Sequence, residues 1–244
     1  MGNVCGKCKG LVSVVVPIRR GENITQLRES VRWSTYMDTE VIVVDKGLER
    51  SAQRNIGIDR AKGEFILILD SDQYVSPTLI GECVARLRLL EDVNALYIPE
   101  TLLTRGFWGR VRDWERQFYT STPVDCVRFV RASKCPKFDE TLTGPEDADW
   151  NNRIEGGKST TTACLYHSEN MGIIKYLQKK AYYAKSMRKY AQKWKNDKVL
   201  NPLWRCFLVF VENRKWKKFI RKPIYAMAVM ALILARGVVY LWNR

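Results

Sequence analysis

The chain has 244 residues, of which 46% are apolar, and its formal net charge is +15. This apolar fraction is typical of a folded protein and argues against a disordered chain. The charge is concentrated, because residues 171–222 contain sixteen Lys and Arg but only two acids and so carry +14. The sequence therefore predicts a near-neutral domain over residues 1–170 and a strongly basic tail.

The seven cysteines include one close pair, Cys5 and Cys8. A zinc ribbon needs a second such pair, so this one is only a weak indication of a metal or a local disulfide. We interpret the cysteines as mostly reduced, which is typical of an interior-facing compartment. We also expect no secretory signal, because the first apolar run, residues 11–16, is short and leads into the folded domain.

Strands and helices alternate through the first part of the chain. Short apolar runs predict three buried strands over 11–17, 40–45 and 64–69, and helical spacing predicts helices over 22–33 and 51–61. This alternation is typical of βαβ units and a parallel sheet. The strand ends near Pro17, Asp45 and Asp70 are then expected at one edge of the sheet, where open α/β sheets bind ligands.

The third of these strands runs directly into two acids, Asp70 and Asp72. Carboxylate oxygens suit Mg²⁺ or Mn²⁺ bridging to phosphate, which makes this a candidate diphosphate site. A simple turn is the alternative, and the spacing alone does not choose between them. No Gly-x-Gly-x-x-Gly follows the first strand and no Walker motif is present, which argues against a dinucleotide oxidoreductase or a phosphate-loop ATPase.

Several short motifs, taken in their order and spacing, resemble the family-two glycosyltransferases that bind nucleotide-diphospho-sugars. The motifs are Ser13-Val-Val-Val-Pro17 with Glu22-Asn23, Val43-Val-Asp45, Arg54-Asn55-Ile-Gly57-Ile58 with Ala61-Lys-Gly63-Glu64, and Leu69-Asp-Ser-Asp72. The resemblance implies an α/β fold, Rossmann-like and of the GT-A type, with a mostly parallel central sheet. The chain departs from the family pattern at Lys46, where an acid is common, and at Arg19 and Arg20.

The resemblance also implies which residues meet the donor. It places a nucleotide diphosphate sugar against Pro17, Arg19, Asp45, Arg54 and Asp70. It implies a Mn²⁺ or Mg²⁺ cofactor bound by Asp72, with Asp70 beside it.

The middle of the chain predicts a helix over 76–90, strands over 93–98 and 126–131, and an aromatic helix over 105–119. One face of the aromatic helix carries Trp108, Val111, Trp114 and Phe118. Such a stripe is usually buried core, but the basic tail led us to favour a membrane-surface or acceptor-side role.

A second acidic cluster begins at Pro145, where Glu146 and Asp147 open a predicted helix. Helix capping alone would explain acids there. The family resemblance implies that Asp147 is the catalytic base and that Glu146 orients it or binds the acceptor. His167, the only histidine, follows a predicted strand over 160–166; a structural role is the ordinary one, but its position resembles that of a metal-binding histidine in related folds.

The tail predicts attachment to a membrane. Residues 171–222 are predicted to form basic amphipathic helices, which favour an anionic membrane surface over the competing partner, nucleic acid. Residues 223–244 are predicted to hold a transmembrane or anchoring helix, since the apolar run over 223–242 approaches the length needed to cross a bilayer. Arg236 interrupts that run, so an interfacial helix or a hairpin against a partner is the alternative. The positive-inside rule places the catalytic domain on the cytoplasmic face.

Together these features predict an inverting, metal-dependent glycosyltransferase, the inversion being implied by the resemblance. The expected partners are a nucleotide diphosphate sugar, a membrane, and a polyprenyl or dolichyl phosphate or lipid-linked glycan as acceptor, with no nucleic acid. The alternatives are an anchored transferase with a protein or soluble glycan acceptor, a small polysaccharide synthase, and a catalytically silent membrane adaptor.

Overall fold

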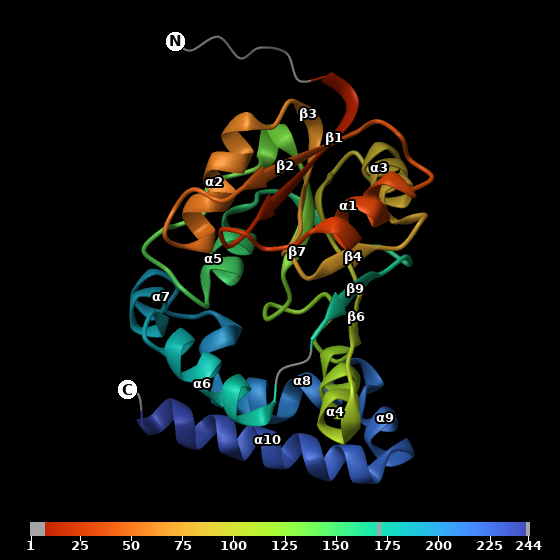
Figure 1. Ribbon diagram of the computed structural model, residues 1–244. Helices are drawn as coiled ribbons and strands as arrows, with labels where there is room; N and C mark the ends of the chain where they lie inside the picture. Colours follow the sequence, from red (N-terminus) through yellow and green to blue (C-terminus); the bar gives the residue numbers. More distant parts are fainter. Residues whose placement is uncertain (1–7, 170–171, 243–244) are drawn as a thin grey trace.

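The main sheet of the protein has six strands in the order β2-β1-β3-β7-β5-β8 (Figure 1). The computed structural model describes residues 8–169 and 172–242, so Cys5 of the predicted cysteine pair lies outside the described residues. The strands of this sheet are β1 (Cys8–Pro17), β2 (Thr39–Val44), β3 (Gly63–Ile68), β5 (Val93–Tyr97), β7 (Val127–Arg131) and β8 (Gly157–Thr160).

The sheet is mixed but mostly parallel, because five of its six strands run in one direction and only β7 runs against them. Strands β2, β1 and β3 are parallel, as the βαβ alternation predicted, and β5 is parallel to β8. Strand β7 is antiparallel to both of its neighbours, β3 and β5. The reason is the chain path: after β5 the chain forms β6 and α4 and then returns to the same end of the sheet, which reverses β7.

A second, three-stranded sheet was not predicted. It has the order β4-β9-β6 and consists of β4 (Gln73–Val75), β9 (Leu165–Ser168) and β6 (Glu100–Leu103). The strand predicted over 160–166 is in fact divided, since β8 ends at Thr160 and β9 begins at Leu165. In the register of this small sheet Gln73 lies opposite His167, which brings the histidine to the segment that follows Asp72.

Helices cover both faces of the main sheet (Figure 1). On one face α1 (Thr25–Arg32) and α3 (Leu79–Leu89) pack against side chains such as Val14 and Leu67. On the other, α2 (Arg50–Arg60) and α5 (Glu146–Arg153) pack against Val15, Ile66 and Ile68. Neighbouring residues of one strand thus enter opposite cores, which explains why these strands are apolar without alternation.

Helix α2 approaches the sheet closely at Gly57. A β-carbon added there would overlap the Val15 side chain. We therefore expect Gly57→Ala to lower the free energy of unfolding by about 1–3 kcal/mol, because a packed core resists added volume. Urea denaturation checks this. Gly237→Ala is the matched control, since Gly237 also lies in a helix but has nothing within 4 Å of the added carbon. An equal loss of stability in both variants would contradict the explanation.

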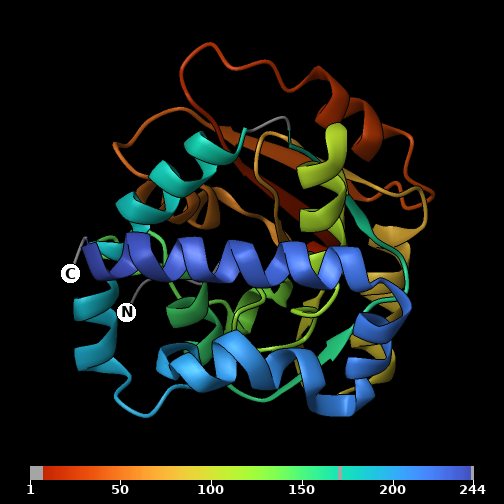
Figure 2. The same cartoon turned by 90° about the horizontal axis from the view of Figure 1, so that it is seen from below.

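The tail forms a layer of helices beneath the sheets (Figures 1 and 2). The first part of the segment predicted to form basic amphipathic helices holds α6 (Ile173–Ala184) and α7 (Met187–Lys193). They are followed by α8 (Val209–Val211), α9 (Trp216–Arg221) and α10 (Pro223–Trp242). Seen from below, α10 crosses the whole of this layer (Figure 2).

The aromatic helix α4 (Gly106–Arg116) packs inside the protein. Val111, Trp114 and Phe118 are buried in a cluster that also contains Val229 and Leu232 of α10. Three of the four residues predicted on this face thus have the ordinary core role, whereas Trp108 is exposed and an interfacial role for it stays a prediction. The contact to α10 takes the place that a lipid surface was expected to fill.

Helix α10 coincides with the segment predicted to span a membrane. Within residues 8–169 and 172–242, no helix is both long and apolar enough to cross a bilayer, so the spanning prediction is not supported. Arg236, which interrupts the apolar run, is turned toward α4: its Nη2 lies 2.5 Å from Glu115 Oε1 and its Nη1 donates to the Tyr176 hydroxyl at 3.1 Å. The charge that made a spanning helix costly is thus neutralised by the protein itself.

Candidate active site

The candidate site begins where β1, β3 and β2 end side by side. Pro17 pairs with Val44 in the parallel register, and Val15 pairs with Ile68. Asp45 and Asp70 therefore follow the strands on either side of β1, at the one edge of the sheet where the sequence predicted them. Arg19 and Asp45 expose their side chains at this edge.

Arg54 of α2 joins the two acidic clusters. Its side chain is fully buried, its Nη2 lies 2.9 Å from Asp70 Oδ1, and its Nη1 lies 2.7 Å from Asp147 Oδ1. The second Asp70 oxygen, Oδ2, lies 3.3 Å from Nη1 of Arg128 on β7. The guanidinium of Arg54 also lies 4.9 Å from the centroid of the Phe138 ring, while its buried Nε has no hydrogen-bond partner among the residues that the structure describes. A single buried cation thus fixes two carboxylates that are far apart in the sequence.

The arginines keep both carboxylates ionised. Burial alone would raise the pKa of Asp70, but Arg54, Arg128 and Arg50 hold it well below its ordinary value. Burial acts on Asp147 in the same direction, and the same three arginines again make the net shift of its pKa downward. Both residues therefore carry a negative charge near neutral pH.

Glu146 and Asp147 face different surroundings. The Glu146 side chain is 2% exposed and its Oε1 lies 2.8 Å from Arg50 Nη2, whereas the Asp147 side chain is 26% exposed. Burial, together with the adjacent charge of Asp147, raises the pKa of Glu146. Of the two acids, Asp147 is therefore the one that a second substrate can reach.

A second cluster lies just beyond the third strand end and contains Asp72 and His167. Asp72 Oδ2 is 3.1 Å from His167 Nε2, and Glu100 Oε1 is 2.7 Å from His167 Nδ1. Glu100 also pairs with Arg116 of α4 at 2.5 Å. Burial would lower the pKa of His167, but its hydrogen bonds to Asp72 and Glu100 and their charges raise that pKa to about 9. Glu100 thus holds the ring in place with its Nε2 toward Asp72.

These residues fit a divalent ion in part. Two atoms that bind one ion at ordinary lengths lie about 3 Å apart, as Asp72 Oδ2 and His167 Nε2 do. Within the part of the chain that the structure describes, no group of three or more His, Cys, Asp or Glu side chains is placed to hold a metal. Asp70, predicted as a further ligand, instead turns its two oxygens to Arg54 and Arg128.

Some residues of the site were not predicted. They are Arg50, Glu100, Arg116, Arg128 and Tyr183, and each binds a predicted site residue or one of its partners. Arg128 left a signal in the sequence, because a charged residue between Val127 and Phe129 in a buried strand needs a partner. The other four lie in segments whose packing the sequence does not define.

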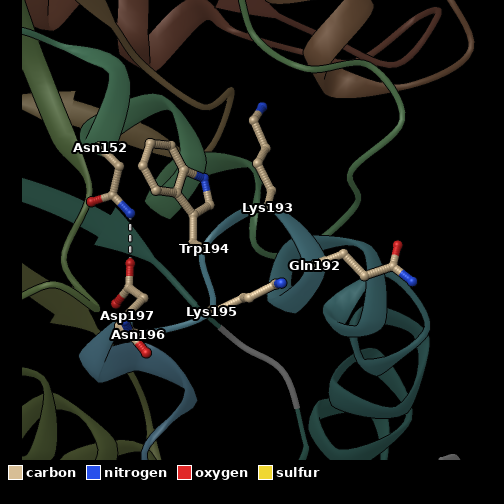
Figure 3. A pocket seen from close by; sticks show the side chains of 7 residues that line it. All are labelled: Asn152, Gln192, Lys193, Trp194, Lys195, Asn196 and Asp197. Carbon is tan, nitrogen blue, oxygen red and sulfur yellow. Dashed lines mark hydrogen bonds between the residues drawn. The ribbon is translucent and has the colours of Figure 1, made fainter.

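A shallow pocket lies at the other end of α5 (Figure 3). It is lined by Asn152 and residues 192–197, and Asn152 donates to Asp197 at 2.5 Å. Lys193 and Trp194 bind Asp149 beside it, which docks α7 on α5. The pocket therefore lies in the interface between the tail helices and the domain that contains the sheets, and these contacts hold that interface together.

Comparisons with known proteins give a family match over part of the chain and a fold likeness over most of it. Residues 46–133, well under half of the chain, match the model of glycosyl transferase family 2. The matched stretch contains Arg54, Asp70, Asp72 and Arg128 and supports a glycosyltransferase. No curated protein sequence matches the chain.

Solved structures share the fold. A mannosyltransferase, PcManGT from Pyrobaculum calidifontis in complex with GDP-Man and Mn²⁺, has a TM-score of 0.60 and 13% identity, over 96% of this chain and 87% of that chain. The S. aureus TarS structure of residues 1–349 has a TM-score of 0.52 and 16% identity, over 71% of this chain. The match covers 64% of that TarS chain, less than two thirds of its length. At these identities the likeness shows the fold alone, an α/β GT-A-like fold with a mixed sheet.

Proposed function

We propose that the protein is a metal-dependent glycosyltransferase that moves a sugar from a nucleotide diphosphate donor to an acceptor held at a membrane. The observation that carries this proposal is the bridge of Arg54 between Asp70 and Asp147, next to the pair of Asp72 and His167. The carboxylates that we propose to bind the donor and to face the acceptor are thus held by one arginine at the same edge of the sheet. The family match over residues 46–133 supports the same reaction class.

The donor is proposed to lie along the three strand ends. Pro17, Arg19 and Asp45 would border the nucleotide, and Asp70 and Arg54 would lie beneath the ribose and diphosphate. Asp72 and His167 would hold Mn²⁺ or Mg²⁺, and the donor diphosphate would supply further oxygen ligands. When bound, the ion neutralises charge that develops on the departing diphosphate. The Mn²⁺ in the complex of PcManGT with GDP-Man is the support that the structural neighbours give.

Asp147 is proposed to act as the general base. It is ionised and partly exposed, and it can accept the proton of the acceptor hydroxyl as that oxygen attacks the anomeric carbon. Direct displacement of this kind inverts the configuration at that carbon. Glu146, tied to Arg50, would keep the start of α5 in position. Arg54 would hold Asp147 in line with the donor.

The acceptor is proposed to be a polyprenyl phosphate or a lipid-linked glycan. The outer face of the tail exposes apolar side chains at Ile220, Ile224, Met227, Leu234 and Val238, within a segment rich in Lys and Arg. An apolar face with basic surroundings suits the surface of an anionic bilayer. We propose that α10 lies in that surface, with the catalytic domain on the cytoplasmic side. Incubation with Mn²⁺, UDP-, GDP- or dTDP-sugars and two acceptors, a short-chain polyprenyl phosphate and a polyprenyl-linked glycan, tests the proposal, and the absence of both transfer and donor hydrolysis with either acceptor would refute it.

Asp72→Asn is expected to weaken Mn²⁺ binding at least about tenfold, because a neutral amide replaces a charged ligand. Calorimetric titration of the protein with Mn²⁺ in the presence of the donor nucleotide measures the change. Asp38→Asn is the matched control, because Asp38 is exposed and lies outside the site. Unchanged Mn²⁺ affinity in Asp72→Asn would remove Asp72 from the proposed metal site.

A further inference from the structure

A cluster of basic side chains surrounds Tyr176 where α6, α4 and α10 meet. The Arg112 guanidinium lies 4.0 Å from the centroid of the Tyr176 ring, and the Lys180 ammonium lies 5.4 Å from it. Arg236 donates to the Tyr176 hydroxyl at 3.1 Å. Three cations from three helices thus meet at one aromatic ring.

The positive charge of this cluster exceeds the negative charge beside it. Arg112 pairs with Glu169, and Arg236 pairs with Glu115. Lys180 is half-buried and makes no ion pair with any residue that the structure describes, although Arg205 also lies within its electrostatic range. Glu115 offsets part of the repulsion on Lys180, but two carboxylates face the three cations of the cluster, so one positive charge is left for an anion to balance.

The electrostatics of Lys180 agree with this geometry. Burial, together with the charges of Arg236, Arg205 and Arg112, lowers the pKa of Lys180 to about 7. An ammonium in this state is stabilised by any anion that binds beside it.

The position of the cluster connects it to the candidate site and to the tail. Tyr176 and Tyr183 are seven residues apart on α6, about 10 Å along the helix axis. The Tyr183 hydroxyl accepts from Arg50, which in turn binds Glu146 beside Asp147. At the other end, Arg236 belongs to α10, whose outer face exposes apolar side chains. The cluster therefore lies between the proposed lipid surface and the proposed base.

We propose that Lys180, Arg112 and Arg236 bind a phosphate or diphosphate group of the lipid-linked acceptor. The inference rests on the proposed function and narrows its acceptor class.

A phosphate bound beside Tyr176 would lie about 10 Å along α6 from Tyr183, which is linked to Asp147 through Arg50 and Glu146. Such a phosphate is therefore not the nucleophile in this proposal, and the reacting hydroxyl belongs to a sugar carried by it. The acceptor is accordingly a glycan on a lipid phosphate or diphosphate, and a bare polyprenyl phosphate is excluded.

Binding of farnesyl diphosphate in detergent micelles, measured by calorimetry in EDTA, tests the cluster apart from catalysis. EDTA removes the divalent ion on which diphosphate binding at the donor site would depend. Lys180→Gln is expected to weaken binding at least about tenfold, because a charge-assisted contact to the diphosphate is lost. Lys175→Gln is the matched control, since it removes the same charge from an exposed position on the same helix. Equal affinities for Lys180→Gln and the unaltered protein, or equal losses in both variants, would overturn the proposal.

Two further measurements separate a binding role from a structural one. Without ligand, Lys180→Gln is expected to raise the melting temperature by about 2 °C, because a repelling charge is removed. A lowered melting temperature would indicate a structural lysine and count against the proposal. Inorganic phosphate is the other arm: if it binds as tightly as farnesyl diphosphate, the lipid part of the proposal is wrong. None of these binding and melting measurements requires sugar transfer. A negative result for the Lys180 cluster can therefore be told apart from a lack of transferase activity.

Discussion

Asp147→Asn is expected to lower the rate of sugar transfer by about 10²–10⁴-fold while leaving donor affinity within about twofold. The amide keeps the shape of the side chain and can still accept a hydrogen bond from Arg54, but it cannot take the acceptor proton. The measurement is kcat for transfer, together with calorimetric titration of the donor nucleotide.

Asp149→Asn is the matched control, because it makes the same change on the same helix. Asp149 is buried and bound to Arg153 and Lys193, so its loss is expected to lower the melting temperature and leave kcat unchanged. If Asp147→Asn retained full turnover, the base would have to be another group.

Arg54→Met is expected to lower the free energy of unfolding by about 3–5 kcal/mol. The substitution keeps most of the side-chain volume but leaves Asp70 and Asp147 without the cation that bridges them. Arg60→Met is the control, since Arg60 is exposed on the same helix and its loss should cost little. Urea denaturation of the two variants measures the difference.

A double-variant cycle shows whether the loss comes from the bridge. In the Asp147→Asn background one of the two carboxylates is already neutral, so Arg54→Met should cost at least about 1 kcal/mol less than in the unaltered protein. If the two substitutions were additive, the pair of Arg54 with Asp147 would contribute nothing to the loss, which would then come from the pair with Asp70 and from packing against Phe138.

Much of the site could be predicted from local sequence. Asp70 and Asp72 followed a strand whose apolar pattern was plain, and the parallel register of β1, β2 and β3 placed three strand ends at one edge. The signal for a helix that begins at Glu146 was equally local, because Pro145 and the acids after it mark a helix start. These features depend on neighbours within a few residues, which is why pattern and propensity were sufficient.

The contacts that hold the site together could not be predicted in the same way. Strand β7 reverses direction because of the path through β6 and α4, and a three-residue strand such as β4 has too few residues to show a period. The burial of α4 depended on α10, more than a hundred residues later, and the same is true of the pairing of Glu115 with Arg236. An apolar run interrupted by an arginine indicates a membrane or a docked helix with equal force until the partner of that arginine is known.

The pairing of β4 with β9 also has a consequence for biosynthesis. Asp72 and His167 are 95 residues apart, and the histidine joins a short strand near the end of the catalytic region. A ribosome that has completed the strand ends near Pro17, Asp45 and Asp70 has therefore not yet produced the second member of the pair. The site that we propose for the ion is complete only after residue 167 has been translated, so a nascent fragment would carry the proposed nucleotide site without it.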